Sequence, residues 1–381
     1  MANLIQEKIA LSVRTRREAL GLSQKELADL VGFGSHQIVS DLERGQRDVK
    51  AWELAKIAEV LHVNLPSLLG LEATERPEPR VFWRLGAETA DRPRREARLR
   101  ERLDRYRRLE RIVGVADHAE ALPEYPLSPE RASFGYVHRL ASQVWRSMEL
   151  GGRPAFSLVG ALEERFGVKI FFDDLGSGES AACVRGTEDA GILMNRNESP
   201  WRQRFSFAHE LFHLVTWDSV MSVWPDGDKE PTWSNRLETL ANVFAAALVL
   251  PGDIVRTEFR SRFEEREPSD SELVDMARSY GVSTEALLWR LRNLDLISDE
   301  AVRNRLDSPD FRQLDRATMP AHWDETPPDL PERFIRLVAL AYQSGDLSRS
   351  SAAKYLEKDP GDLYYLDWDD ENGSPANAGR T

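Results

Sequence analysis

The segment 208–214, with the sequence AHELFHL, constrains this chain more than any other part of it. It contains H-E-x-x-H, in which His209 and His213 share one face of a helix and Glu210 stands beside the first of them. Apolar residues recur here with the period of a buried helical face, at Ala208, Leu211, Phe212 and Val215. Since the chain has only 7 His, a chance match is rare. The motif predicts a buried helix whose two imidazoles bind one Zn²⁺, with Glu210 as general base; the alternative is a core helix with two hydrogen-bonded His.

Length and composition limit the classes of protein to consider. A chain of 381 residues is too long for one core and predicts about two to four domains. A single cysteine, Cys183, excludes an intramolecular disulfide and a thiolate-rich zinc site. No segment approaches the roughly 18 apolar residues of a membrane span, and the first residues do not resemble a secretory signal, so we expect a cytoplasmic protein with no membrane partner. The net charge of −13 argues against a broad nucleic-acid-binding surface but permits one local DNA-binding module.

The pattern of breaks predicts four regions. Residues 1–72 form short helices separated by Gly, and 73–130 form a linker that begins in the Pro-rich run EATERPEPR and carries an Arg-rich amphipathic helix near 92–111. Residues 131–300 form a mixed domain, and 301–381 form a helical segment with a disordered tail at 369–381. Within the mixed domain we expect helices at 132–145 and 236–250, strands at 168–172 and 191–195, and a polar loop at 217–234.

The first region shows the signals of a helix-turn-helix. Ser23 caps a helix, and Glu26 completes a capping box. Apolar positions of that helix pack inward, at Leu27, Ala28 and Val31, and Gly32 permits the turn that follows. With LGLSQKELADLVG, IVSDLERGQR and ELAKIAEVLHVNLPSLLG in this order, residues 13–69 resemble the Xre/phage-repressor helix-turn-helix family. The resemblance implies a five-helix bundle that binds double-stranded DNA.

The second helix of this module is expected to lie in the major groove. The residues predicted to contact DNA are Ser35, His36, Gln37, Ser40, Asp41 and Arg44, while Val39 and Leu42 face the core. Gln24, at a helix start, is placed to hold a phosphate. The turn is one residue longer than is usual in the family, and acidic side chains are about as frequent as basic ones, so tight binding would need a homodimer or a second contact. The alternative is a helical bundle that binds a protein.

A zinc site needs a third protein ligand and one open position. The acidic candidates that follow the motif are Asp226, Asp228, Glu230 and Glu238. Only Glu238 lies on a strongly periodic helix, whose core positions include Leu240, Phe244, Ala247 and Leu248. The alternative for Glu238 is a carboxylate that stabilises the start of its helix.

Three segments in the same order resemble the ImmA/IrrE family of metallopeptidases, over about 131–296. They are ALEERFGVKIFF with ILMNRN, RQRFSFAHELFHLV and ETLANVFAAALVLP. The resemblance implies His209, His213 and Glu238 as metal ligands and Glu210 as general base. It also implies a protein substrate, often a helix-turn-helix repressor. Zn²⁺ is the expected ion, and Mn²⁺ or Fe²⁺ can occupy the same ligand set.

Other features have more than one interpretation. Arg204 either stabilises an oxyanion or forms a salt bridge. The loop 217–234, with Met221, Trp224 and Trp233, either gates the cleft or is partly buried. The Arg-rich helix is a solvated face, a phosphate-binding helix or a dimer helix. The helices beyond residue 272, including one that Ser283 should cap, are scaffold or partner-docking elements.

These observations predict an α+β, predominantly helical protein with a helix-turn-helix bundle, a zincin-like domain with a small sheet, and carboxy-terminal helices. The function they indicate is a DNA-binding regulator fused to a zinc metallo-endopeptidase, acting on a regulatory protein in a stress, phage or mobile-element response. The rival is a transcription factor or antitoxin-like regulator whose peptidase fold senses a ligand or holds a partner without proteolysis.

Overall fold

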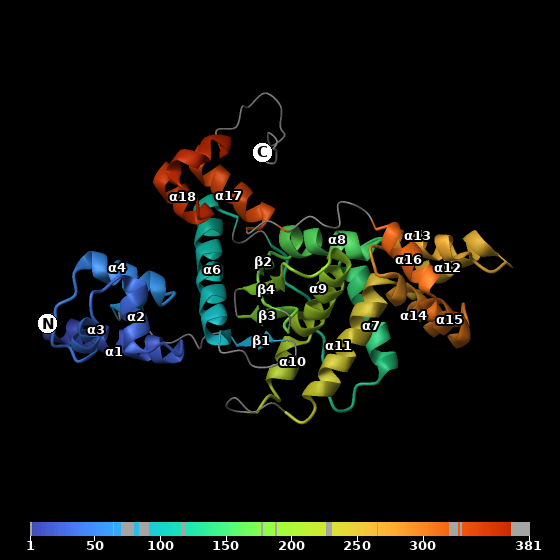
Figure 1. Cartoon of the computed structure of the whole chain (residues 1–381), viewed down its shortest axis with the longest axis horizontal. Helices are drawn as coiled ribbons and strands as arrows, with labels where there is room; N and C mark the ends of the chain where they lie inside the picture. Colours follow the sequence, from blue (N-terminus) through green and yellow to red (C-terminus); the bar gives the residue numbers. More distant parts are fainter. Residues whose placement is uncertain are drawn as a thin grey trace. The chain divides into compact units, whose positions relative to one another are not determined.

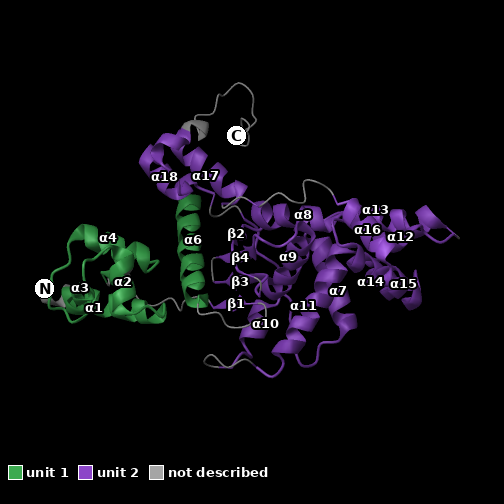
Figure 2. Cartoon of the chain, viewed as in Figure 1, with its two compact units in different colours: residues 1–79, 87–111 green, residues 80–86, 112–381 purple. Residues whose placement is uncertain are grey.

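The computed structural model of the chain describes residues 2–63, 65–69, 80–83, 91–115, 119–176, 178–186, 189–225, 231–264, 266–319, 327 and 330–366 (Figure 1). Most of the run 72–80, the ligand candidates Asp226, Asp228 and Glu230, and the tail 369–381 lie outside these residues. The chain folds as two compact units, one of residues 1–79 and 87–111 and the other of residues 80–86 and 112–381 (Figure 2). The predicted α+β, mainly helical fold is confirmed.

The first unit begins with the predicted five helices: α1 (Ala2–Ala19), α2 (Gln24–Val31), α3 (His36–Glu43), α4 (Ala51–Val60) and α5 (Leu65–Leu68). Ser23 caps α2 and forms the predicted capping box with Glu26. Gly32 ends α2 with a φ of 81°, a left-handed conformation that glycine adopts without strain. The predicted inward residues are buried in one core, namely Leu27, Ala28, Val31, Val39 and Leu42.

The Arg-rich segment forms a long helix, α6 (Arg92–Val113). Ala97 of α6 packs into the core of the helix-turn-helix bundle. Four apolar or aromatic residues at helical spacing along α6 are buried, namely Leu99, Leu103, Tyr106 and Leu109. This helix is therefore more than a solvated face.

A four-stranded mixed sheet forms the β part of the second unit. Its strands are β1 (Val81–Trp83), β2 (Lys169–Asp173), β3 (Ala181–Arg185) and β4 (Ala190–Asn195), in the order β1-β3-β4-β2. β2 and β4 are parallel, while β3 is antiparallel to both β4 and β1. Cys183 of β3 is paired with Ile192 on one side and Phe82 on the other. The edge strand β1 thus comes from the region predicted as a linker.

The sequence predicted only two of these strands. β2 carries Ile-Phe-Phe and β4 carries Ile-Leu-Met, two short apolar runs, and each strand lies within one residue of its predicted bounds. β3 begins Ala-Ala-Cys, small residues that carry little strand preference, and β1 is only three residues long. Both were missed because pairing with their neighbours, rather than intrinsic propensity, makes them strands.

Helices pack against the sheet in layers. α9 (Pro200–Val215) contacts β3 and β4, and α11 (Ser234–Val249) packs against both α9 and α7 (Phe134–Ser147), as Figure 1 shows. The other helices of this part are α8 (Pro154–Gly160), the π-helical turn η1 (Ala161–Arg165) and α10 (Trp217–Met221). α10 corrects the prediction of an irregular loop across 217–234. The side chains between these layers form the main core of the unit.

The helices that follow are α12 (Gly252–Phe263), α13 (Asp270–Tyr280), α14 (Thr284–Asn293), α15 (Asp299–Asp307), α16 (Pro309–Ala317), α17 (Glu332–Gln343), α18 (Arg349–Leu356) and the 3₁₀ helix η3 (Pro360–Leu366). Ser283 caps α14 as predicted. Residues of α12–α16 belong to the same core as α9 and α11, so these helices are scaffold.

Among the described residues, no single helix combines the length and apolar composition that crossing a membrane requires. Only α11 with α12 passes the same test as a pair, and they meet at a bend of 46°.

Candidate functional site

The start of α9 is fixed by a buried amide at the end of β4. Nδ2 of Asn195 donates hydrogen bonds of 2.8 Å to the carbonyls of Gly176 and Glu179. Nε2 of Gln203, in the first turns of α9, donates to the carbonyl of Asn195 over 3.1 Å. Pro200 at the first helical turn needs no hydrogen bond to its nitrogen. The motif helix is therefore held in a set orientation against the sheet.

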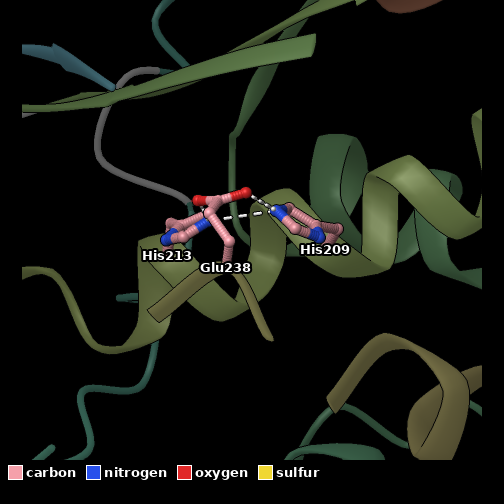
Figure 3. A group of neighbouring side chains, drawn as sticks. All are labelled: His209, His213 and Glu238. Atoms are coloured by element: carbon pink, nitrogen blue, oxygen red, sulfur yellow. Dashed lines mark hydrogen bonds and ion pairs between the residues drawn. The ribbon is translucent and has the colours of Figure 1, made fainter. Parts of the chain in front are cut away.

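Three predicted ligands meet at the crossing of α9 and α11 (Figure 3). The Nε2 atoms of His209 and His213 lie 3.2 Å apart. Each also faces one carboxylate oxygen of Glu238, at 3.2 Å from His209 and 3.3 Å from His213. All three side chains are buried. Burial alone would raise the pKa of Glu238, but hydrogen bonds with the two imidazoles lower it below its usual range.

The size of this triangle fits a small divalent ion. Ligand atoms at about 2.0–2.1 Å from a tetrahedral zinc lie about 3.3 Å from one another. The separation of 3.2 Å between the two Nε2 atoms matches that spacing, and so do the distances of 3.2 and 3.3 Å from the two imidazoles to the two different oxygens of the Glu238 carboxylate. The donor set of two imidazoles and one carboxylate is also one that zinc prefers. The residues therefore fit zinc on both geometry and chemistry.

Asn242, one helical turn beyond Glu238, supports the first ligand. Its Oδ1 lies 3.1 Å from Nδ1 of His209. Because an amide oxygen only accepts, Nδ1 of His209 donates, which leaves Nε2 with a lone pair toward the ligand triangle. The sequence analysis missed Asn242, although its spacing of i+4 from Glu238 places both on one face of α11.

Glu210 is fully buried, with 0% exposure. Neither of its carboxylate oxygens accepts a hydrogen bond from an N–H or O–H group of the described residues. The thiol of Cys183 on β3 is close enough to interact with this carboxylate; burial raises the pKa of the thiol, and the charge of Glu210 raises it further. A buried carboxylate whose oxygens lack an N–H or O–H donor among the described residues is costly, which is typical of a group kept for chemistry rather than for stability.

Aromatic side chains enclose the site. The ring of Phe82 on β1 lies 4.3 Å from the imidazole of His213, measured between centroids. Phe82 also contacts Trp224, and Trp224 contacts Trp233, each with an edge-to-face geometry at 5.4 Å. Both Trp residues are half-buried, so this part of the 217–234 segment packs beside the metal centre. The exposed fractions of His209, His213 and Glu238 are only 0%, 3% and 8%.

Arg204 packs against α8 and the turn after α13. Its guanidinium stacks over the ring of Phe156 at 4.4 Å and donates to the carbonyl of Gly281 over 3.4 Å. Burial lowers its pKa. These contacts tie α9 to α8 and to the turn after α13, which favours a packing role over stabilisation of an oxyanion.

The predicted DNA-contact residues gather on α3 and its ends. Ser35 caps the helix, and Ser35, His36, Gln37 and Arg44 are exposed, whereas Ser40 and Asp41 are half-buried. Asp41 accepts from Nε2 of Gln37 at 2.9 Å and from Nη2 of Arg44 at 2.5 Å. The acidic side chain thus neutralises the one cation among the predicted contacts.

Gln24 is held inside the module. Its Nε2 donates to Glu43 over 2.8 Å. Arg17 of α1 binds both oxygens of the same carboxylate, at 2.6 and 3.1 Å. These bonds fix α3 relative to α1 and α2, a role of Gln24 in addition to the phosphate contact predicted for it.

Comparisons with known proteins agree with this geometry. Residues 163–292 match the family model described as IrrE N-terminal-like domain, and residues 13–68 match the one described as Helix-turn-helix. The Radiation response metalloprotease IrrE of Deinococcus deserti is 33% identical over 144 residues, which are 37% of this chain and 48% of that protein. The protein of the same name from Deinococcus radiodurans is 32% identical over 190 residues, 47% of this chain and 55% of that protein. The chain thus spans about half the length of the curated relatives it matches.

Among solved structures, the apo form of the competence regulator ComR from Streptococcus vestibularis covers 92% of this chain and 90% of its own, with 12% identity and a TM-score of 0.17. That score is too low to bear on the fold. Two family models thus match one chain: residues 13–68 are similar to a helix-turn-helix domain, and residues 163–292 are similar to an IrrE N-terminal-like domain.

Proposed function

We propose that this chain is a DNA-binding regulator that carries a zinc-dependent endopeptidase and cuts a regulatory protein, such as a helix-turn-helix repressor. One observation carries the peptidase assignment. The Nε2 atoms of His209 and His213 lie 3.2 Å apart and 3.2–3.3 Å from the two carboxylate oxygens of Glu238, and Glu210 beside them accepts no hydrogen bond from an N–H or O–H group of the described residues. A core helix with two hydrogen-bonded His needs neither a third ligand nor an unpaired acid.

In the proposed reaction each side chain has one task. A zinc ion held by the triangle would polarise the scissile carbonyl and a water molecule. Glu210 takes a proton from the water and passes it to the leaving amine. Asn242 keeps the imidazole of His209 in the tautomer that binds the ion. Enclosure by Phe82 and Trp224 lowers the local dielectric, which strengthens the charge interactions of the reacting groups.

The amino-terminal domain is proposed to bring the peptidase to DNA. The helix-turn-helix match and the exposed side chains of Ser35, His36 and Gln37 support this role. Because Asp41 neutralises Arg44, one copy of the domain should bind weakly, and a homodimer on a two-fold site would supply the missing contacts. The name that the two relatives share, radiation response metalloprotease, favours a stress response as the setting.

The decisive variant is Glu210→Gln, which keeps the size of the side chain but removes the base. We expect it to bind zinc as the wild type does and to lose cleavage of a candidate repressor by at least 10²-fold. Zinc content is measured by elemental analysis and cleavage by mass spectrometry. Glu285→Gln on α14, an exposed carboxylate outside the site, is the matched control. Equal cleavage by Glu210→Gln and the wild type would falsify the peptidase assignment.

A second candidate function is a regulator that does not cut. The near-complete burial of the three ligands favours it, since a site closed to solvent suits a sensor or a structural ion. Under this hypothesis Glu210→Gln leaves the transcriptional response unchanged, whereas His213→Ala, which removes a ligand, abolishes it. The two variants together separate the hypotheses.

A further inference from the structure

The edge strand β1 lies beside the metal centre and comes from outside the matched peptidase domain. It pairs with β3 through three residue pairs, Val81 with Val184, Phe82 with Cys183 and Trp83 with Ala182. The matched peptidase family domain starts at residue 163, so this strand comes from outside it. β1 lies instead in the connection that follows the helix-turn-helix bundle. A segment of the connection that follows the helix-turn-helix bundle therefore completes the sheet beside the site.

The side chain of Phe82 on β1 covers one of the ligands, His213. Residues directly opposite in an antiparallel pair point to the same face of a sheet. Cys183 interacts with Glu210, and Phe82 stacks on His213, so that shared face is the one that meets α9. Phe82 is itself only 6% exposed. A peptide cannot reach His213 from this side while Phe82 is in place.

An extended segment is what a peptidase substrate presents, and the free edge of a sheet is a ready-made partner for one. From these observations, and resting on the proposed peptidase function, we propose that β1 occupies the place of the substrate. The substrate is then an extended peptide with an aromatic residue at the position of Phe82. It binds β3 by strand addition, and it enters by replacing β1.

The energetics suit such an exchange. Three residue pairs are at the lower limit for a strand, so few backbone hydrogen bonds are lost when β1 leaves. The three side chains of β1 are all buried and apolar or aromatic. Their removal exposes apolar surface, and only an incoming segment of similar character restores that burial. This requirement selects an apolar, aromatic-containing substrate segment over a polar one.

Cys183 gives a readout that does not depend on catalysis. It is the only cysteine of the chain, it has 0% exposure, and it lies opposite Phe82. Its reaction rate with a disulfide reagent such as dithionitrobenzoate reports how often β1 leaves β3. We expect Phe82→Gly to raise this rate at least tenfold in the full zinc-loaded chain. Phe82→Leu, which keeps an apolar side chain, should stay near the wild type, and Phe134→Ala, an exposed aromatic on α7, is the matched control.

Binding is tested with the peptide Ala-Arg-Val-Phe-Trp-Ala, which contains the sequence of 80–83, labelled with a fluorophore. Chains carrying Glu210→Gln are used so that no peptide is cut. We expect the chain that also carries Phe82→Gly to bind at least tenfold more tightly than the chain with Phe82 intact. The same peptide with Gly in place of Phe should lose this gain. If Phe82→Gly does not fold, as judged by circular dichroism, Phe82→Ala takes its place in both assays.

The outcomes separate this inference from the proposed function. Faster thiol labelling and tighter peptide binding support the inference. If the Phe82 variant with Glu210 intact nevertheless cuts no peptide, that result counts against the peptidase function and leaves the inference standing. Unchanged labelling and unchanged binding in folded variants overturn the inference, because β1 is then a permanent strand of the sheet. The inference fails in that case whether or not the chain is a peptidase.

Discussion

Nδ1 of His209 donates a hydrogen bond of 3.1 Å to Oδ1 of Asn242, one helical turn beyond the Glu238 ligand. This bond joins the two helices that supply the metal ligands and sets the tautomer of the first. We expect Asn242→Ala to weaken zinc binding by about 10–100-fold, because an imidazole without its outer hydrogen bond is a poorer and less well oriented ligand. A chelator-competition titration measures this affinity.

Thr239→Ala is the control for this experiment, since Thr239 is exposed on α11 and its hydroxyl bonds only within the helix, to the carbonyl of Asn235. A zinc affinity of Asn242→Ala equal to that of Thr239→Ala would show that Asn242 serves packing alone.

Zinc binding should stabilise the second unit. The ligand triangle exists only in the folded chain, so an ion at 100 times its dissociation constant adds about 2.7 kcal/mol to the free energy of unfolding. Removing the ion with a chelator should therefore lower the midpoint of urea unfolding in the wild type. Glu238→Ala lacks one ligand and should show almost no response to the chelator. A response as large as that of the wild type would contradict the assigned ligand set.

Glu163 of η1 makes stability depend on pH. Its Oε1 is buried without a hydrogen-bond partner among the described residues. Burial, with the charge of Glu164 next in importance, raises its pKa to about 7, although Arg333 and Arg336 oppose the shift. The folded state binds this proton more tightly than the unfolded state does. The contribution of this proton to the free energy of unfolding is therefore fully present below about pH 4.5 and is lost as the pH rises through 7.

The variant Glu163→Gln cannot titrate at this position. Between pH 5 and pH 8 the wild type should lose about 1–3 kcal/mol of unfolding free energy relative to the variant. Urea unfolding at several pH values measures the difference. Parallel pH profiles for the two proteins would show that the carboxyl of Glu163 ionises normally.

Arg17 and Glu43 hold the helix-turn-helix together. Glu43 is almost fully buried, with 3% of its side chain exposed, and it binds Arg17 through both oxygens. Glu43→Ala leaves a largely buried guanidinium without its carboxylate, which should cost about 3 kcal/mol. Amide hydrogen exchange in α2 and α3 should accelerate accordingly. Glu18→Ala removes an exposed partner of the same Arg17 and should change the exchange rates little.

Asp41 should limit the affinity for DNA. It lies within 2.5 Å of Nη2 of Arg44 and accepts from Gln37 as well. In Asp41→Ala the guanidinium is free to bind a phosphate, so duplex affinity rises and the slope of log affinity against log salt steepens by about one. Fluorescence anisotropy across a salt series measures both. The control is Asp48→Ala, since Asp48 is an exposed acid outside α3 and its removal makes the same change in net charge. If release of Arg44 causes the steeper slope, Asp48→Ala should leave the slope unchanged.

The candidate metal centre was predictable because its residues obey local rules. His209 and His213 are fixed by helical spacing alone, and the apolar period of 236–250 marked the helix that carries Glu238. Asn242 could have been predicted in the same way, because it lies four residues after Glu238 on the same helix. Phe82 and Cys183 were not, since their roles depend on a pairing between strands that lie about 100 residues apart in sequence.

By itself the sequence determined the elements with strong local signals: the capped helices of the helix-turn-helix, the motif helix, its partner helix and the two apolar strands. Periodicity and capping are properties of residues close together in the chain, so they can be recognised in the sequence without knowledge of the fold. Only the tertiary structure decided that β1 completes the sheet and that Phe82 covers His213. These relationships arise from side chains and strands that meet through packing, which no local pattern encodes.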